Sequence, residues 1–498
     1  MAWAITANLR AQAAAAGPAV GAVQLPLSGR TGEPGAVVTV QNPIPSASTV
    51  NTLSSSIEVQ GAYQGSVPTS QTPGAPLRLS LADAIRRGLE ANLGNVGYKN
   101  TVRQALADRK LALSALLPNI NAYMQATEEQ INLAAFGFNF HLPIAGFSIP
   151  TVVGPFHFVD ARATLTENVV NITALRNYRS SKESLRATQF SAQDARDLVA
   201  LAVTGGYLNI IAAAARIDSA RAQVAAAQAV YKQAVDRHDA GLAARIDVTR
   251  SQVELQVQQQ RLTSQETDHA KLKIQFGRII GLPPGQEFTL ADTVPYSPLT
   301  DLTLDQALAQ AYENRADLKA ALTQVQAAEL AKKAAQAEHY PYIDLYSDYG
   351  ASGPAPQNSH GVFTVAGTVR FPIFEGGRIR ADIEAADAAL RQRQAEAADL
   401  RGQIDADVRQ AFLDLTTAAE QVRVAVSNRE LAQETLAQSR DRFAAGVTDT
   451  VEVVQSQEQV AAAEDDYIAG LYAHNLAKAS LARAMGQADQ NIQKFLGR

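Results

Sequence analysis

A glycine interrupts a stretch that otherwise favours one long helix, RFAAGVTDTVEVVQSQ at residues 442–457. Residues 237–252 read RHDAGLAARIDVTRSQ, and Gly241 stands there where Gly446 stands in the later stretch. Glycine adopts the left-handed backbone conformation that ends a helix at little cost. The two glycines therefore predict two places where a long helix stops and the chain reverses.

The two glycine stretches belong to a longer internal repeat. LSLADAIRRGLEAN, starting at Leu79, matches LTLDQALAQAYENR, starting at Leu302, which is an offset of 223 residues. The glycine stretches are offset by 205 residues, from Gly241 to Gly446. We infer a duplication in which the first copy carries 18 additional residues, placed in the aromatic segment at residues 136–156.

Each copy ends in a very long helical pattern. In the second copy, apolar residues recur at three- and four-residue spacing over residues 379–415, the spacing of a coiled-coil seam. Residues 378–443 contain no proline and one glycine, Gly402, so they predict a rod of about 100 Å. Residues 451–485 are expected to return along that rod, giving an antiparallel helical hairpin.

The two predicted turns differ in how the returning helix starts. Thr448 or Asp449 could cap it in the second copy, whereas residues 243–244 are alanines and offer no side-chain cap. Asp247 and Glu452 would lie near the positive ends of the two returning helices.

A glycine pair also interrupts the first long helical pattern. Gly205 and Gly206 stand where the second copy has Gln410 and Ala411, and they predict a bend or a close helix contact unless they are simply tolerated.

Four segments with two-residue alternation lie between the helical parts. They form two predicted strand hairpins, at about residues 119–172 and about residues 342–374. In YIDLYSDYG, for example, Ile343 and Leu345 alternate with Asp344. Each segment has about the 9–11 residues that cross a bilayer in a tilted barrel, although one such strand would also suit a soluble sheet.

Four strands are too few to close a barrel, because small barrels need about eight. An open sheet edge in hydrocarbon would leave backbone donors and acceptors unpaired. If these strands enter a membrane, several chains must share one barrel.

Composition and motifs exclude several classes of protein. The 498 residues carry a net charge of −5 and no dense basic stripe, so nucleic acid is not an expected partner. The absence of cysteine removes disulfides and thiolate chemistry, and no run of 18 apolar residues argues for a transmembrane helix. The seven histidines form no HExxH pair, and no phosphate-binding or nucleophile-elbow motif occurs. We therefore expect no catalytic, cofactor-binding or metal site, and no enzyme activity.

The expected organisation has four parts. Residues 1–76 would be an extended or disordered arm rich in Gly, Pro, Ser and Thr, residues 77–290 and 291–486 the two repeats, and residues 487–498 a tail. The start, MAWAITANLRAQAAAAGPA, has small residues typical of the end of a signal peptide but lacks an apolar core. Either the true start lies upstream or this segment is unstructured, and we favour the first.

Taken together, residues 77–486 resemble the outer-membrane efflux family, the TolC-like channel-tunnels. The resemblance is carried by the duplication, the helix-to-strand entries at Pro118 and Pro341, NRADL at residues 314–318, FPIFEGGR at residues 371–378 and the glycine turns. It implies a mainly helical fold with a small β part and a homotrimer in the bacterial outer membrane. Four strands per chain would make a 12-stranded barrel in the lipid, continued through the periplasm by a tunnel of 12 helices.

The resemblance also implies a function and its partners. The chain would be a passive exit duct of a tripartite efflux or type I secretion system. A periplasmic membrane-fusion adaptor would connect it to an inner-membrane pump of the RND or ABC type. The alternative is a soluble coiled-coil scaffold, which predicts extraction without detergent and no ion conductance. The exported substrate is not legible in either case.

The family pattern further implies the site residues. The hairpin tips would dock on the adaptor, through Ala240, Gly241, Leu242, Ala243, Ala445, Gly446, Val447 and Thr448. The periplasmic entrance would be formed by Asp247, Phe443, Thr448, Glu452 and Gln455. Phe443, Thr448 and Gln455 replace a tyrosine, an arginine and a second acid of the family pattern, so we expect a weaker or differently built closure. A ring of Glu452 side chains would favour cations, unless Glu452 is merely solvated.

Overall fold

The computed structural model describes residues 21–26, 37–43, 53–59, 61–68, 74–137, 150–292, 296–298 and 302–496. The expectation about the chain start lies outside these residues. So does most of the predicted 18-residue excess. Within the described residues helices predominate and strands form a smaller part, as the sequence predicts.

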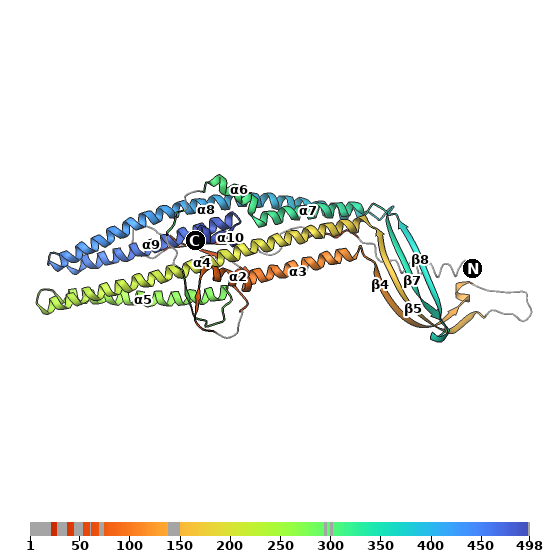
Figure 1. The fold of residues 1–498 in the computed structure, drawn as a ribbon, viewed down its shortest axis with the longest axis horizontal. Helices are drawn as coiled ribbons and strands as arrows, with labels where there is room; N and C mark the ends of the chain where they lie inside the picture. Colours follow the sequence, from red (N-terminus) through yellow and green to blue (C-terminus); the bar gives the residue numbers. More distant parts are fainter. Residues whose placement is uncertain are drawn as a thin grey trace, which may run out of the picture. The chain divides into compact units, whose positions relative to one another are not determined.

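Two sets of elements follow one another in the same order (Figure 1). The first comprises α2 (Leu81–Ala91), α3 (Leu93–Ser114), β4 (Asn119–Asn132), β5 (Val152–Val170), α4 (Ile172–Asp239) and α5 (Arg245–Ile279). The second comprises α6 (Leu304–Asn314), α7 (Ala316–Ala337), β7 (Tyr342–Gly353), β8 (His360–Arg370), α8 (Arg378–Ala444) and α9 (Thr450–Ala484). The bounds of α3 and α7 differ by 223 residues and those of α5 and α9 by 205, the two offsets of the sequence repeat.

Shorter elements accompany these two sets. Strands β1 (Val37–Pro43) and β2 (Leu53–Val59) pair antiparallel within the predicted arm, and the 3-10 turn η1 (Gly61–Gln64) follows. Strand β3 (Leu77–Leu79) pairs parallel with β6 (Phe288–Leu290). The remaining elements are the 3-10 turns η2 (Ala134–Phe136) and η3 (Pro356–Asn358) and the helix α10 (Ala488–Phe495). The residues predicted as a C-terminal tail thus include a helix.

The chain divides into two compact units, and the unit containing residues 104–185 and 323–394 holds the sheet. Its strands are antiparallel in the order β4-β5-β7-β8, so β4 and β8 each have one partner and form the two edges. The alternation expected from the sequence is present: Tyr349 pairs with Phe363 across β7 and β8, and the two side chains are 73 % and 75 % exposed. Asp348, on the opposite face, forms an ion pair with Arg162 (3.2 Å).

The other unit contains residues 29–103, 186–322 and 395–498, and its main core lies where the short elements meet the long helices. Tyr207 and Phe276 are fully buried there, with ring centroids 6.1 Å apart. The Tyr207 hydroxyl donates to the carbonyl of Leu79 (3.1 Å), which ties β3 to α4. Helix α10 adds Ile492 to the same core.

The glycine pair of α4 lies in this core. The helix continues through Gly205 and Gly206. A Cβ atom on Gly206 would lie 2.8 Å from Cδ2 of Phe276, closer than real Cβ contacts. The predicted close helix contact is therefore confirmed, and its cause is the Phe276 ring.

Helix α4 departs from the expectation that no helix is apolar enough to cross a membrane. One 18-residue window of α4 has a mean hydropathy of 1.8, so by length and composition it could do so. Because 67 % of that window is buried within the protein, packing against neighbouring helices accounts for its apolar character.

Candidate functional site

Both long helical hairpins turn at the predicted glycines. Gly241 and Gly446 have φ of +73° and +74°. In the first turn the amides of Gly241 and Leu242 donate to the carbonyls of His238 (2.9 Å) and Arg237 (2.8 Å). This pair of bonds is the Schellman arrangement that satisfies the last carbonyls of a helix. The second turn has the same bonds, from Gly446 to Phe443 (3.0 Å) and from Val447 to Arg442 (2.9 Å).

The two tips present apolar side chains to solvent. Leu242 is 73 % exposed and Val447, at the equivalent position, is 69 % exposed. A side chain that usually packs back onto its helix is thus left free at both tips. Ala240 and Ala445 are exposed as well.

The returning helices start differently, as predicted. Asp449 caps α9, and its carboxylate accepts from the amide of Val451 (3.0 Å). Ala244 stands at the start of α5 with no side-chain hydrogen bond. Asp247 and Glu452 lie in the first turns of these helices, where the helix dipole favours an acid.

Arg237 joins the two hairpins. Its guanidinium donates to the carbonyl of Phe443 (2.5 Å) and lies 4.7 Å from the centroid of the Phe443 ring. Phe443 is 4 % exposed and packs with Val230 and Val453. A cation from the first hairpin therefore covers the C-terminal end of α8, where carbonyl groups lack helical partners.

A second bond joins the starts of the returning helices. The Thr450 hydroxyl donates to a carboxylate oxygen of Asp247 (2.8 Å), and Thr450 is fully buried. Asp247, predicted at the entrance, is thus held by the other hairpin.

Glu452 is held on its own hairpin. The Thr448 hydroxyl donates to one of its carboxylate oxygens (2.5 Å), and Arg442 forms an ion pair with the other (3.2 Å). The side chains of Arg442 and Glu452 are 57 % and 33 % exposed. Gln455 is exposed, one turn further along α9.

The predicted entrance residues therefore separate into distinct groups. Thr448 and Glu452 contact each other, Asp247 contacts Thr450, and Phe443 is buried beneath Arg237. The sequence argument missed Arg237 and Arg442, although both open the stretches on which it rested. Their equivalent positions, 205 residues apart, were the available signal.

Further along the hairpins, α5 and α9 are joined by charge. Arg261 forms an ion pair with the buried carboxylate of Asp465. Burial raises the pKa of Asp465, and the nearby guanidinium of Arg261 opposes that effect. Ser439 and Ser456 share a buried hydrogen bond of 2.8 Å between α8 and α9.

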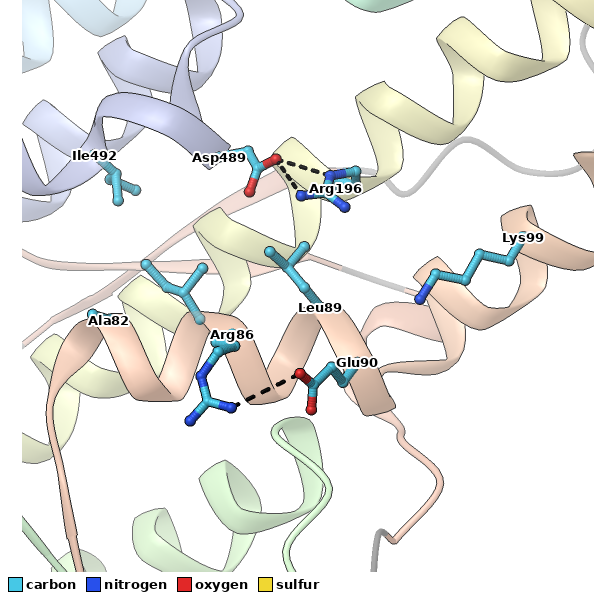
Figure 2. A pocket seen from close by; sticks show the side chains of 9 residues that line it. Ala82, Arg86, Leu89, Glu90, Lys99, Arg196, Asp489 and Ile492 are labelled. Atoms are coloured by element: carbon cyan, nitrogen blue, oxygen red, sulfur yellow. Dashed lines mark hydrogen bonds and ion pairs between the residues drawn. The ribbon is translucent and has the colours of Figure 1, made fainter.

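One cavity lies away from the tips, in the same unit. Figure 2 shows it over α2, with a volume of about 430 Å³. Its charged groups pair with one another: Arg196 with Asp489 (2.8 Å) and Arg86 with Glu90 (3.9 Å). Among the described residues, no cluster of three His, Asp or Glu side chains is placed to hold a metal ion.

The geometry defines a class of protein: long paired helical hairpins combined with a four-stranded sheet that is open at both edges. Solved outer-membrane channels share this fold. VceC of Vibrio cholerae superposes with a TM-score of 0.68 at 16 % identity, covering 82 % of this chain and 96 % of VceC. CmeC of Campylobacter jejuni superposes with a TM-score of 0.70 at 12 % identity, covering 93 % and 98 %.

The chain belongs to the outer membrane efflux protein family, whose description matches residues 307–487. Among curated relatives, the pyoverdine export outer membrane protein OpmQ of Pseudomonas aeruginosa is 25 % identical over 407 residues, which are 80 % of this chain and 83 % of OpmQ. The family places the chain in the outer membrane and assigns it to efflux, not to catalysis.

Proposed function

We propose that the chain is the outer-membrane exit duct of a tripartite efflux or type I secretion system. The observation that carries the proposal is a four-stranded sheet with two open edges and strongly exposed apolar side chains such as Met124 (74 %) and Phe363 (75 %). Such a face suits lipid, but open edges in lipid leave backbone groups unpaired. Closure therefore requires several copies, and a homotrimer would supply a 12-stranded barrel continued by 12 helices.

The proposed protomer is an internal duplication. Residues 77–290 would form the first repeat and residues 291–486 the second, preceded by the arm at residues 1–76. The equal order of elements and the constant offsets between their bounds support this division.

The hairpin tips are the proposed docking site for a periplasmic membrane-fusion adaptor. Support comes from the exposed Leu242 and Val447, which stand at equivalent places on two equally built turns. An adaptor that presents repeated apolar contacts could engage both tips in the same way. An inner-membrane pump of the RND or ABC type would supply the energy, and the duct would be a passive conduit. The relative named for pyoverdine export favours a small-molecule cargo.

The entrance is proposed to close through contacts between the two hairpins of one chain. Arg237 on Phe443 and Asp247 on Thr450 would restrain the second hairpin against the first. They would take the place of the groups that the family pattern has at Phe443, Thr448 and Gln455. Glu452 would line the narrowest part of the entrance.

The test is purification followed by planar-bilayer recording. We expect extraction from membranes only with detergent, a native mass equal to three chains, and discrete single-channel conductance. A protein extracted without detergent, monomeric and without conductance would instead support the soluble coiled-coil scaffold.

A further inference from the structure

Helices α3 and α7 stand at equivalent places in the two halves, but only α7 is covered. On α7, Ala327 and Ala334 are 2 % and 0 % exposed. The equivalent residues of α3, at an offset of 223, are Gln104 and Leu111. Gln104 is exposed and Leu111 is 72 % exposed. A face that is buried on α7 is therefore open on α3.

The cover of α7 is helix α4. The Ser180 hydroxyl donates to the carbonyl of Ala327 (2.8 Å), and Arg176 donates to the carbonyl of Lys333 (2.6 Å). Ser180 is 5 % exposed. These bonds fix which face of α4 receives α7.

The equivalent face of α8 is open. At the offset of 205, Ser180 corresponds to Ala385 and Arg176 to Ala381, and both alanines are exposed. The offset holds along these helices, since Val199 of α4 and Ile404 of α8 are both fully buried. Small exposed side chains let a second helix approach closely.

The open faces continue the open edges of the sheet. Within the chain, β5 pairs with β7, and α7, which leads into β7, packs on α4, which follows β5. Helix α3 leads into the edge strand β4, and α8 follows the other edge strand, β8. The chain thus holds one complete joint and the two halves of another.

We propose that α3 of one copy packs on α8 of the next copy as α7 packs on α4, with Gln104 against Ala385 of the neighbouring copy. The partner is a second copy of this chain, so the inference rests on the proposed oligomer and adds its register. The contact is head-to-tail, and repeating it around an axis closes a ring.

The cysteine-free chain allows a direct test. In the variant Gln104→Cys with Ala385→Cys, a disulfide requires the two Cα atoms to come within about 7 Å. We expect mild oxidation to yield covalent dimers and trimers on a denaturing gel, and reductant to return monomers. The matched control is Arg103→Cys with Ala385→Cys. Arg103 is as exposed as Gln104, but its equivalent, Gln326, is exposed on α7 as well. The crosslinked fraction should be at least about tenfold lower in the control.

Single variants show the direction of the contact. Oxidised alone, Gln104→Cys and Ala385→Cys should each stay monomeric on the denaturing gel, and their co-expressed mixture should stop at dimers. Crosslinking of Gln104→Cys with itself would overturn the head-to-tail contact.

Native mass separates the inference from the proposed function. A native trimer whose double variant stays uncrosslinked, or crosslinks no better than the control, overturns the register and leaves the duct standing. A native monomer overturns both.

Discussion

Arg237 makes the clearest single-residue contribution at the tips. Its guanidinium both donates to a free carbonyl of Phe443 and covers the ring of Phe443. We expect Arg237→Met to lower the local stability of the second turn by about 1–3 kcal/mol, through loss of a charged hydrogen bond and a cation–π contact. Amide hydrogen exchange of residues 443–449 measures the change. His238→Ala, at an exposed neighbouring position, is the control. Equal protection in both variants would contradict the role of Arg237.

Asp194 should make stability depend on pH. Burial raises its pKa to about 6, against the opposing charges of Arg483 and Arg315 and with further upward contributions from Asp317 and Asp197. A raised folded-state pKa means that Asp194 stabilises the fold fully below its unfolded value of 3.8, and that this stability is lost as pH rises through about 6.

The matching measurement compares wild type with Asp194→Asn between pH 3.5 and pH 7. Relative to the variant, the free energy of unfolding of the wild type should fall by up to about 3 kcal/mol over this range. Chemical unfolding in detergent at several pH values gives the difference directly. A difference that stays constant with pH, or grows as pH rises, would show that the Arg483 ion pair outweighs burial.

At the scale of elements, the sequence predicted the long helices almost to the residue. The prediction of 378–443 compares with an observed α8 ending at Ala444, and 451–485 compares with α9 at Thr450–Ala484. Both ends are marked by a glycine turn, and no proline intervenes, so local signals suffice. The register between hairpins was not predictable, because Arg237 and Phe443 are far apart in sequence and neither carries a local mark of the other.

Helix α10 shows a signal that was present but passed over. Ala488, Ile492 and Leu496 recur every four residues and are all buried. An eight-residue helix has little stability of its own, so its formation depends on the core it joins. Length alone had suggested a tail.

Two glycines inside long helices should respond oppositely to alanine. A Cβ on Gly402 would meet no atom within 4 Å, so Gly402→Ala should stabilise the protein by about 0.5–1 kcal/mol through helix propensity. A Cβ on Gly206 would lie 2.8 Å from the buried Phe276 ring. Gly206→Ala should therefore destabilise by about 1–2 kcal/mol net, since overpacking outweighs propensity. Thermal unfolding of both variants decides, and a gain in stability for Gly206→Ala would show that the ring yields.

At the scale of the whole molecule, the fold class followed from pattern, whereas assembly follows from what one chain leaves unpaired. Alternation predicted the strands, but only the observed order β4-β5-β7-β8 shows that both edge strands lack a partner. The resemblance of residues 77–486 to a known family supplied the number of copies. Neither source placed the entrance residues, because their contacts run between hairpins.

Ion selectivity of the assembled duct tests the proposed entrance. Glu452 carries a negative charge that Arg442 partly offsets at 3.2 Å. In a trimer, Glu452→Gln removes three such charges, so the cation-to-anion permeability ratio should fall towards one. Arg442→Gln should shift the ratio the other way, because it leaves Glu452 uncompensated. Reversal potentials in a salt gradient across a planar bilayer measure both, with Glu458→Gln, an exposed acid further along α9, as the control. Equal reversal potentials for wild type, Glu452→Gln and Arg442→Gln would place the selective constriction elsewhere in the duct.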